Sequence, residues 1–417
     1  MQHIIIGTGP AGVIAAETLK KVAPDSQITL IGSEPEPPYS RMAIPYYLVE
    51  QIGEEGTWLR DGENHFAELG IKRITDRVSG VDTTSQTLTL ENGEPLRWDR
   101  LLIASGSHPV KPPIPGIDLP QVQSCWTLED ARQIAARAQP GANVVLMGAG
   151  FIGCIILEAL HNRGVNLTVI ETGDRMVPRM LNEKAGNLLK SWTQSKGVTV
   201  HTSTSVEAIE ASSSEQVNVR LSNGETLPAD LVISATGVRP NTDFLNDTGI
   251  EIRSGIVIDD TMQSSIDNIF AAGDVAEGYD FSTGMHSVQA IQPTAADHGR
   301  IAALNMAGIT TAHRGSVNMN VLDTLGLITT SFGLWAGSGD GDETELYNPQ
   351  SYKYINLQFD GDRLIGASTA GMTNHVGVIR GLIQNRTRLG PWKDRLIKDP
   401  TRLMEAWVGI CENISPG

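Results

Sequence analysis

Short apolar runs alternate with helix-like stretches along most of this chain. The run at residues 3–6 is followed by a stretch with helical spacing that ends at Val22, and a second run covers residues 27–31. The same order returns over residues 144–170. Apolar runs of this length between helices are typical of parallel strands that are buried on both faces. The pattern therefore predicts an α/β fold with two strand–helix–strand units.

The rest of the chain predicts a hairpin, a linker and a further domain. Residues 84–90 and 96–98 flank Asn92-Gly93, which predicts a hairpin closed by a type I′ turn. The proline-rich stretch at residues 109–120 is expected to cross between domains. From about residue 318 onward, strand-like runs precede helix-like ones. This order indicates a separate C-terminal domain of α+β type.

A glycine pattern suited to dinucleotide phosphates follows the first strand of each unit. The glycines are Gly7, Gly9 and Gly12 in the first copy and Gly148, Gly150 and Gly153 in the second. In each copy the next strand ends beside an acidic residue, Glu34 or Glu171, near the spacing of about 20 residues that a dinucleotide fold shows. Such glycines permit a tight turn and let a pyrophosphate approach the N-terminus of the helix. One copy alone would also fit an ordinary turn, but two copies in this context predict a chain that holds two dinucleotides.

Composition narrows the classes of function. The formal net charge of −16 argues against a nucleic-acid partner and against an anionic membrane surface. Since no basic segment and apolar stretch precede the first strand-like run, no signal peptide is expected, and no apolar run is long enough to span a bilayer. Cys125, Cys154 and Cys411 lie far apart and predict neither a disulfide framework nor a metal site. We therefore expect a cytoplasmic protein with no membrane association.

An ordered series of motifs resembles the pyridine nucleotide–disulfide reductase superfamily of flavoproteins. Besides the two glycine loops, the series contains Ala104-Ser105-Gly106, Ala235-Thr236-Gly237 and a run that ends in Gly273-Asp274. The resemblance implies two Rossmann-like domains. The FAD domain would be split into residues 1–112 and 245–317, and the NAD(P) domain at residues 113–244 would be inserted between the two pieces. An interface domain at residues 318–417, of the kind through which these proteins commonly form homodimers, would follow.

The resemblance also implies cofactor contacts, residue by residue. The FAD contacts would be Gly7, Gly9, Pro10, Ala11, Gly12, Glu34, Arg41, Val78, Ala104, Ser105, Gly106, Gly273, Asp274, Pro293 and Thr294. The NAD contacts would be Gly148, Gly150, Phe151, Ile152, Gly153, Glu171 and Gly237. Asp274 would bond the ribityl chain or a phosphate, and the helix at 293–306 would aim its N-terminus at the flavin pyrimidine. A solvated loop acid or helix cap for Asp274, a surface ion pair for Arg41 and an interface role for the helix stay open as alternatives.

Two departures from related enzymes bear on the chemistry. Pro38-Tyr39-Ser40-Arg41 is similar to a segment of ferredoxin and rubredoxin reductases and of the nitrite reductase large subunit, but Met42 stands where coenzyme A–disulfide reductases carry a redox cysteine. A thioether forms no thiolate, so disulfide reductase activity is not expected. Tyr46 and Ile155 replace a Lys and a Glu that pair beside the flavin in the ferredoxin reductases. Because both partners are lost together, no charge is stranded. The double change suggests an apolar flavin face, and we expect slower or differently tuned flavin reduction by nicotinamide.

These residues predict an FAD-dependent NAD(P)H oxidoreductase. Electrons would pass from NADH through FAD to a small redox protein of ferredoxin or rubredoxin type, or to a small molecule. Glu171 can bond a ribose diol and repels a 2′-phosphate, which favours NADH over NADPH, although Arg175 could soften that choice. No catalytic residue is predicted; Tyr46, Ile155 and His298 are candidates to lie near the flavin. The alternatives are an NADH oxidase, a flavin subunit of a larger reductase complex, and an FAD-binding structural or redox-sensing protein with little turnover.

Overall fold

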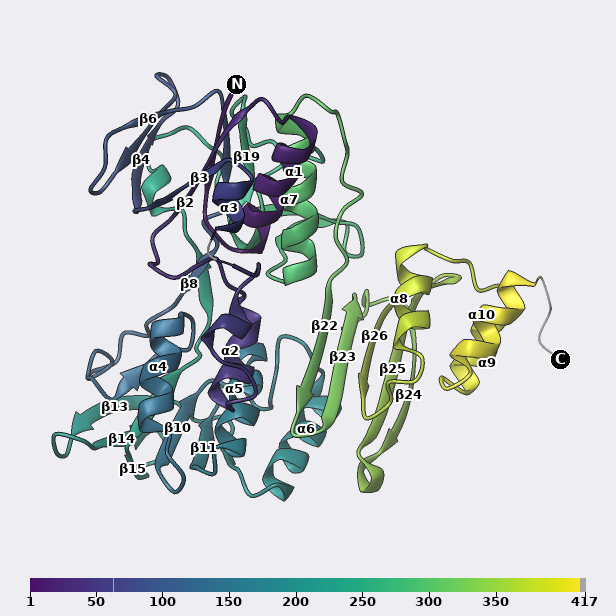
Figure 1. Cartoon of the computed structure of the whole chain (residues 1–417). Helices are drawn as coiled ribbons and strands as arrows, with labels where there is room; N and C mark the ends of the chain where they lie inside the picture. Colours follow the sequence, from purple (N-terminus) through teal and green to yellow (C-terminus); the bar gives the residue numbers. More distant parts are fainter. Residues whose placement is uncertain (63, 413–417) are drawn as a thin grey trace. The chain divides into compact units, whose positions relative to one another are not determined.

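The computed structural model describes residues 1–62 and 64–412. Contacts divide the chain into two compact units, whose elements are labelled in Figure 1. Unit 1 comprises residues 1–47, 52–108 and 238–316. Unit 2 comprises residues 48–51 and 109–237 together with the described residues from 317 onward.

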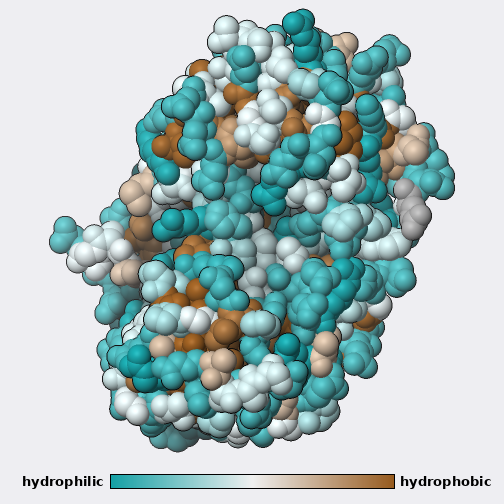
Figure 2. All heavy atoms as spheres, turned by 90° about the vertical axis from the view of Figure 1, so that its left-hand side faces the viewer, coloured by the Kyte–Doolittle hydropathy of each residue, from teal (hydrophilic) through white to brown (hydrophobic). Residues whose placement is uncertain are grey.

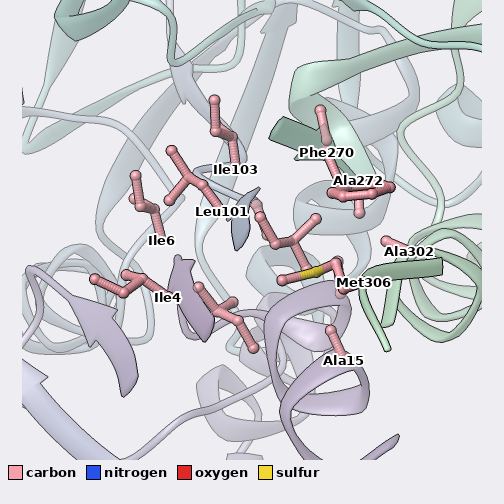
Figure 3. Packing of buried hydrophobic residues seen from close by; sticks show 14 of the residues in the cluster. Ile4, Ile6, Ala15, Leu101, Ile103, Phe270, Ala272, Ala302 and Met306 are labelled. Atoms are coloured by element: carbon pink, nitrogen blue, oxygen red, sulfur yellow. The ribbon is translucent and has the colours of Figure 1, made fainter. Parts of the chain in front are cut away.

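A five-stranded parallel sheet forms the centre of unit 1. Its strands lie in the order β19 (Ile269–Ala271), β7 (Arg100–Ile103), β1 (Gln2–Ile6), β2 (Gln27–Gly32) and β3 (Ile71–Thr75). Two helices pack beside it, α1 (Pro10–Val22) and α7 (Gln292–Met306). Figure 3 shows the shared core, in which strand side chains such as Ile4, Leu101 and Phe270 gather with Ala15 of α1 and Met306 of α7.

Helices α1 and α7 approach each other at small residues. A Cβ atom on Gly299 would lie 2.2 Å from the carbonyl oxygen of Ala11, so a larger residue there would collide with the backbone. A Cβ atom on Gly273, just beyond β19, would lie 3.3 Å from the Cβ atom of Ala11 and 3.5 Å from that of Ala295. The first turns of both helices therefore meet at the end of β19.

Smaller elements complete unit 1. The strands are β4 (Val78–Asp82), β5 (Thr87–Leu90), β6 (Leu96–Arg97), β18 (Ile256–Val257), β20 (Ala276–Asp280) and β21 (Met285–Val288), with β8 (Ser107–Pro109) paired to β17 (Val238–Pro240). The short helices are η1 (Arg41–Ala43), α2 (Ile44–Leu48), η2 (Glu54–Thr57), α3 (His65–Glu68), η3 (Asp243–Leu245) and η4 (Gly273–Val275). The predicted hairpin is present as β5–β6, but its type I′ turn was wrong: residues 91–95 form a longer loop in which neither Asn92 nor Gly93 has a positive φ.

Unit 2 contains a second parallel sheet. Its strands lie in the order β12 (Thr199–His201), β11 (Asn166–Ile170), β10 (Asn143–Met147), β16 (Leu231–Ser234) and β9 (Val122–Gln123). Its helices are α4 (Leu128–Arg137), α5 (Phe151–Asn162) and α6 (Glu183–Ser195). An antiparallel sheet of β13 (Val206–Ala211), β14 (Val217–Leu221) and β15 (Thr226–Ala229) accompanies them. The two parallel sheets confirm the predicted α/β class.

The C-terminal part of unit 2 is an antiparallel sheet with helices. The strand order is β22 (Met319–Thr324), β23 (Leu327–Gly333), β26 (Arg363–Ala370), β25 (Lys353–Asp360) and β24 (Asp342–Asn348), and the helices are η5 (Pro349–Ser351), α8 (Val376–Gln384), α9 (Trp392–Lys398) and α10 (Leu403–Cys411). The indole Nε1 of Trp192 in α6 donates hydrogen bonds of 3.1 and 3.2 Å to the carbonyl oxygens of Thr324 and Leu325. Residues 113–237 and the C-terminal sheet thus share one compact unit, and the division into three domains stays a prediction.

The face of the molecule in Figure 2 is mostly polar, with small apolar groups between the polar side chains. In the part of the chain that the structure describes, no helix is long and apolar enough to cross a bilayer.

Candidate functional site

The first glycine loop joins β1 to α1 under strict steric limits. Gly7 has a φ of +112°, and a Cβ atom on it would lie 2.0 Å from the carbonyl oxygen of Ala104. A Cβ atom on Gly12 would lie 2.0 Å from the carbonyl oxygen of Gly7. Both positions therefore require glycine so that the loop, the end of β7 and the helix can pack together.

The middle glycine of this loop, Gly9, is not restricted by a steric collision. Gly9 is the N-cap of α1, and a Cβ atom on it would meet no atom of the described residues within 4 Å. No side chain in the described ranges caps α1, its first turn carries no acidic residue, and Pro10 occupies its start. The open space beside uncapped backbone N–H groups fits an anionic group such as a pyrophosphate.

The second glycine loop, between β10 and α5, repeats this geometry. Gly148 has a φ of +98°, and a Cβ atom on it would lie 2.5 Å from the carbonyl oxygen of Ala235. A Cβ atom on Gly153 would lie 2.1 Å from the carbonyl oxygen of Gly148, whereas one on Gly150 would have open space to 4 Å among the described atoms. Helix α5 starts with Phe151 and Ile152 and, within the described chain, has neither a side-chain cap nor an acidic residue in its first turn. This loop fits a second pyrophosphate.

The acidic residues that follow the two glycine loops, Glu34 and Glu171, have different bonding partners. In unit 1, Glu34 forms an ion pair of 2.6 Å with the Nη2 atom of Arg41 and accepts a hydrogen bond from the hydroxyl of Tyr39. Arg41 also donates to the Tyr39 hydroxyl at 3.0 Å. The ion pair that the sequence left open for Arg41 is therefore present, and it brings two of the predicted FAD contacts together.

In unit 2, Glu171 is buried behind the second glycine loop. Its Oε2 atom accepts a hydrogen bond of 2.7 Å from the backbone N–H of Ala149, and its Oε1 atom accepts one of 2.7 Å from Gly173. The hydroxyl of Thr172 donates a second hydrogen bond to Oε1, at 3.3 Å. Since each carboxylate oxygen has two lone pairs, Oε2 retains capacity for a ribose hydroxyl. Arg175 is held by local bonds, from Nε to the carbonyl oxygen of Leu181 at 2.9 Å and from Nη1 to Asp174 at 2.7 Å.

Asp274 lies in η4, next to the junction of α1 and α7. The hydroxyl of Ser107 donates a hydrogen bond of 3.1 Å to its Oδ2 atom. Burial raises the pKa of the Asp274 carboxyl, while the Ser107 bond and the charge of Arg41 act in the opposite direction. The sequence did not single out Ser107, because nothing in its local pattern distinguishes it from a loop serine.

The start of α7 resembles the two loops in being uncapped. Pro293 lies in its first turn, Thr294 is buried, and no described side chain caps the helix. The hydroxyl of Ser40 donates to the Oε1 atom of Gln292 at 2.7 Å, which joins this helix end to the segment that carries Arg41.

The loops at the ends of β7 and β16 are also alike. Gly106 and Gly237 both have positive φ, and a Cβ atom on either would meet none of the described atoms within 4 Å. Ser105 donates from its hydroxyl to the carbonyl oxygen of Asn241 at 2.9 Å. Val78, the remaining predicted FAD contact, is buried in the core at the start of β4.

The three candidates near the flavin lie in different places. Tyr46 is exposed on α2 in unit 1, and Ile155 is partly buried on α5 in unit 2. His298 is buried in α7, where desolvation, and to a lesser degree His313, lower the pKa of its imidazole to about 3. A neutral ring with so low a pKa is a poor proton acceptor at neutral pH, which favours a packing role for His298.

The cysteines are free thiols, and two of them are buried. Burial raises the pKa of the Cys125 thiol to about 12 and raises that of Cys154 further, with nearby carboxylates adding to both shifts. Cys154 is one of the buried residues of α5, and its thiol lies 3.5 Å from the carbonyl oxygen of Ala149. Within residues 1–62 and 64–412, no cluster of His, Cys, Asp and Glu side chains could hold a metal ion.

Comparisons with known proteins agree with this geometry. The chain is 28% identical over 402 residues to the NADH-dependent phenylglyoxylate dehydrogenase subunit epsilon of Aromatoleum evansii, covering 96% of this chain and 95% of the relative. It is 27% identical over 331 residues to the NADH-rubredoxin oxidoreductase of Clostridium acetobutylicum, covering 79% and 81%. A solved structure of an NAD-dependent persulfide reductase from A. fulgidus superposes with a TM-score of 0.88 and 27% identity, covering 99% of this chain and 84% of that one.

A family model described as pyridine nucleotide-disulphide oxidoreductase matches residues 1–299. That range contains both glycine loops, Asp274 and the start of α7. The chain belongs to the pyridine nucleotide-disulphide oxidoreductase family.

Proposed function

We propose that this protein, an FAD-dependent NADH oxidoreductase, exchanges electrons with a small iron–sulfur protein of ferredoxin or rubredoxin type. The observation that carries the proposal is the repeated cradle: in both loops the outer glycines are fixed by backbone collisions, while Gly9 and Gly150 leave open space beside an uncapped helix. Two such cradles serve an enzyme in which one dinucleotide reacts with another. When bound, FAD accepts a hydride from a nicotinamide and can release electrons singly or in pairs.

In this proposal the cradle of unit 1 holds FAD. Gly9 and the first turn of α1 receive the pyrophosphate, and Arg41 supplies positive charge near it. Asp274 accepts bonds from hydroxyls of the cofactor, and the uncapped start of α7 offers N–H groups to the ring system. The remaining predicted contacts, Glu34 among them, would bind other parts of the cofactor.

The cradle of unit 2 would hold NADH in preference to NADPH. The buried carboxylate of Glu171 disfavours a 2′-phosphate, since both charges would be poorly solvated there. Arg175 could neutralise such a phosphate, but its guanidinium is bonded to Asp174 and to the carbonyl oxygen of Leu181. We therefore assign it no role in coenzyme choice.

A thiol relay has no part in the proposed function. Met42 occupies the place of the redox cysteine in related disulfide reductases, and the raised thiol pKa values of Cys125 and Cys154 disfavour thiolates at neutral pH. Free thiols also suit the reducing environment of the cytoplasm, where we place the protein. A homodimer formed through the C-terminal sheet and its helices belongs to the same proposal.

A second candidate is a flavin subunit of a larger complex. It is favoured by the similarity to an epsilon subunit over 95% of that subunit's length. In such a complex the protein would transfer electrons between the nicotinamide coenzyme and partner subunits. An NADH oxidase, or a flavin-binding sensor with little turnover, would use the same two cradles.

Anaerobic titration of the purified protein tests the proposal. The expected preparation is yellow, retains FAD, and is bleached by NADH more readily than by NADPH. Reduced protein should then pass electrons to rubredoxin or ferredoxin faster than to dioxygen. Fast reaction with dioxygen alone would instead favour the oxidase, and a flavin that NADH leaves oxidised would favour the sensor or a partner-dependent subunit. A colourless protein that fails to take up FAD would refute all of them.

A further inference from the structure

The carboxamide of Gln289 is buried without a hydrogen-bond partner. Its Oε1 and Nε2 atoms are both inaccessible to solvent, and no described residue bonds either of them. An unsatisfied buried polar group destabilises the folded protein, so a native protein seldom keeps both ends of an amide unpaired. A ligand that bonds this carboxamide would remove that cost.

The chain and its strand pairing place Gln289 close to two parts of the proposed FAD cradle, η4 and the start of α7. It directly follows β21, whose last residue, Val288, pairs with Glu277 of β20. Strand β20 in turn begins immediately after η4, which carries Asp274. On its other side, Gln289 lies three residues before α7, and its carbonyl oxygen accepts a hydrogen bond of 2.9 Å from Ile291.

The groups around this position have incomplete hydrogen bonding. The start of α7 has N–H groups that no described side chain caps, and contact of Gly273 with Ala295 brings η4 against this helix turn. Asp274 is partly buried and accepts a hydrogen bond from the hydroxyl of Ser107. Gln289 adds a donor and an acceptor side by side, so the cluster presents both kinds of hydrogen-bonding group to whatever it binds.

We propose that Gln289 pairs with the pyrimidine edge of FAD. That edge alternates acceptor, donor and acceptor as C2=O, N3–H and C4=O, and a carboxamide can match any neighbouring donor and acceptor of the series. The N–H groups at the start of α7 would donate to the flavin carbonyl that Gln289 does not bond. This inference rests on the proposed function, because it assumes that unit 1 holds FAD.

If Gln289 pairs with FAD, its removal should weaken FAD binding but should not destabilise the FAD-free protein. With FAD bound, the amide is satisfied, and removing it weakens cofactor binding. Without FAD, the amide is a buried unsatisfied group, and replacing it with an apolar side chain of similar size relieves that cost. A donor to a flavin carbonyl also favours the reduced ring, which carries more negative charge, so its removal lowers the flavin reduction potential.

The test compares Gln289→Leu with Gln263→Leu, a control in the same unit whose side chain is bonded to Asp267 at 3.4 Å near the surface. FAD affinity is measured by flavin fluorescence on reconstitution, together with the visible spectrum, the reduction potential and the thermal midpoint with and without FAD. For Gln289→Leu we expect affinity to fall about five- to tenfold, the loss of about one hydrogen bond. The flavin bands should shift and the potential should fall. The FAD-free variant should melt at or above the temperature of the FAD-free parent.

The same measurements distinguish a flavin partner for Gln289 from a buried water or another part of the chain. If Gln289→Leu changes stability equally with and without FAD and leaves the flavin spectrum unchanged, the amide bonds water or protein, and the pairing is overturned. A parent protein that binds no FAD refutes the proposed function itself, whatever the variant does. Normal FAD binding by Gln289→Leu with an unchanged potential refutes the pairing alone.

Discussion

The carboxylate of Glu171 accepts a hydrogen bond of 2.7 Å from the backbone N–H of Ala149, inside the second glycine loop. The end of β11 is thereby tied to the loop between β10 and α5. In unit 1 the corresponding acid, Glu34, is instead paired with Arg41. The two copies of the motif have kept the same glycine geometry, but their acidic residues have taken different partners.

Two substitutions of Glu171 should therefore affect coenzyme choice and loop stability separately. The neutral amide removes the repulsion of a 2′-phosphate, so the ratio of kcat/KM for NADPH to that for NADH should rise, while the affinity for NADH falls. Glu171→Ala, which leaves two backbone N–H groups without their acceptor, should lower the free energy of unfolding by about 1–3 kcal/mol. Steady-state kinetics and denaturant titration measure the two effects. The control is Glu210→Gln, an exposed acid of unit 2, and an unchanged coenzyme ratio in Glu171→Gln would contradict the assignment.

The glycines of the first loop offer a matched pair of substitutions. A Cβ atom at Gly9 meets open space, so Gly9→Ala should fold with nearly normal stability and yet lose FAD, because the methyl group occupies the place of the pyrophosphate. A Cβ atom at Gly12 would collide with the carbonyl oxygen of Gly7, so Gly12→Ala should lose about 1–3 kcal/mol of stability even without cofactor. Flavin content after gel filtration and apoprotein melting separate the two. Retention of FAD by Gly9→Ala would count against this cradle.

Gly150→Ala should impair reduction by NADH without impairing FAD binding, and so distinguish the functions of the two loops. Its Cβ atom also meets open space, so the variant should remain folded and yellow. Its flavin should nevertheless be bleached slowly by NADH, since the obstruction lies in the other cradle. Dithionite, which needs no nicotinamide site, should still reduce it at the parental rate. A variant that loses FAD instead would show that the second loop does not serve the coenzyme.

His3 should make the protein less stable in mild acid. It is fully buried in β1, and burial, with contributions from the N-terminus and Arg100, lowers the pKa of its imidazole from 6.5 to about 4. The unfolded chain therefore gains a proton below pH 6.5 that the folded chain resists until about pH 4. Stability is unaffected above pH 6.5 and falls by up to about 1.4 kcal/mol per pH unit between these values.

His3→Val tests this expectation, because carboxylates contribute equally to both proteins and cancel in the comparison. The difference in unfolding free energy between variant and parent, measured by denaturant titration at pH 7, 6 and 5, should shift in favour of the variant as the pH falls. His286→Val, at an exposed position, should show no such trend. A pH-independent difference for His3→Val would mean that His3 is not held neutral.

Much of the fold and of both cradles could be predicted from the sequence, because local rules dominate there. Apolar runs between helices predicted both parallel sheets, and the glycines at the ends of β1 and β10 predicted the loops. The Asn92-Gly93 turn was wrong because the pairing of Thr87 with Arg97 leaves a longer loop than a type I′ turn allows. The bond of Ser107 to Asp274 and the unpartnered Gln289 depend on tertiary packing between distant segments, which no local pattern encodes.

Arg163 gives a last prediction about the segment that follows Tyr46. It is almost buried, and its guanidinium donates to three backbone carbonyl oxygens: Leu48 at 2.5 Å, Ala138 at 2.8 Å and Ala135 at 2.9 Å. Residues 48–51 thereby belong to unit 2 although the chain on both sides belongs to unit 1. The planar fork of arginine suits several fixed acceptors at once, which a lysine ammonium on its flexible stem does not.

Arg163→Lys should therefore be nearly as harmful as Arg163→Ala, with a loss of about 2–4 kcal/mol in the free energy of unfolding for either. Loosening residues 48–51 should also increase protease cleavage after Leu48, which mass spectrometry of limited digests can locate. The control is Arg220→Lys, an exposed arginine of unit 2 that pairs with Glu207, where lysine should be tolerated because surface pairs contribute little. If Arg163→Lys matched the parent in both stability and digestion, positive charge alone would hold the segment, and the geometry of the fork would have no part in it.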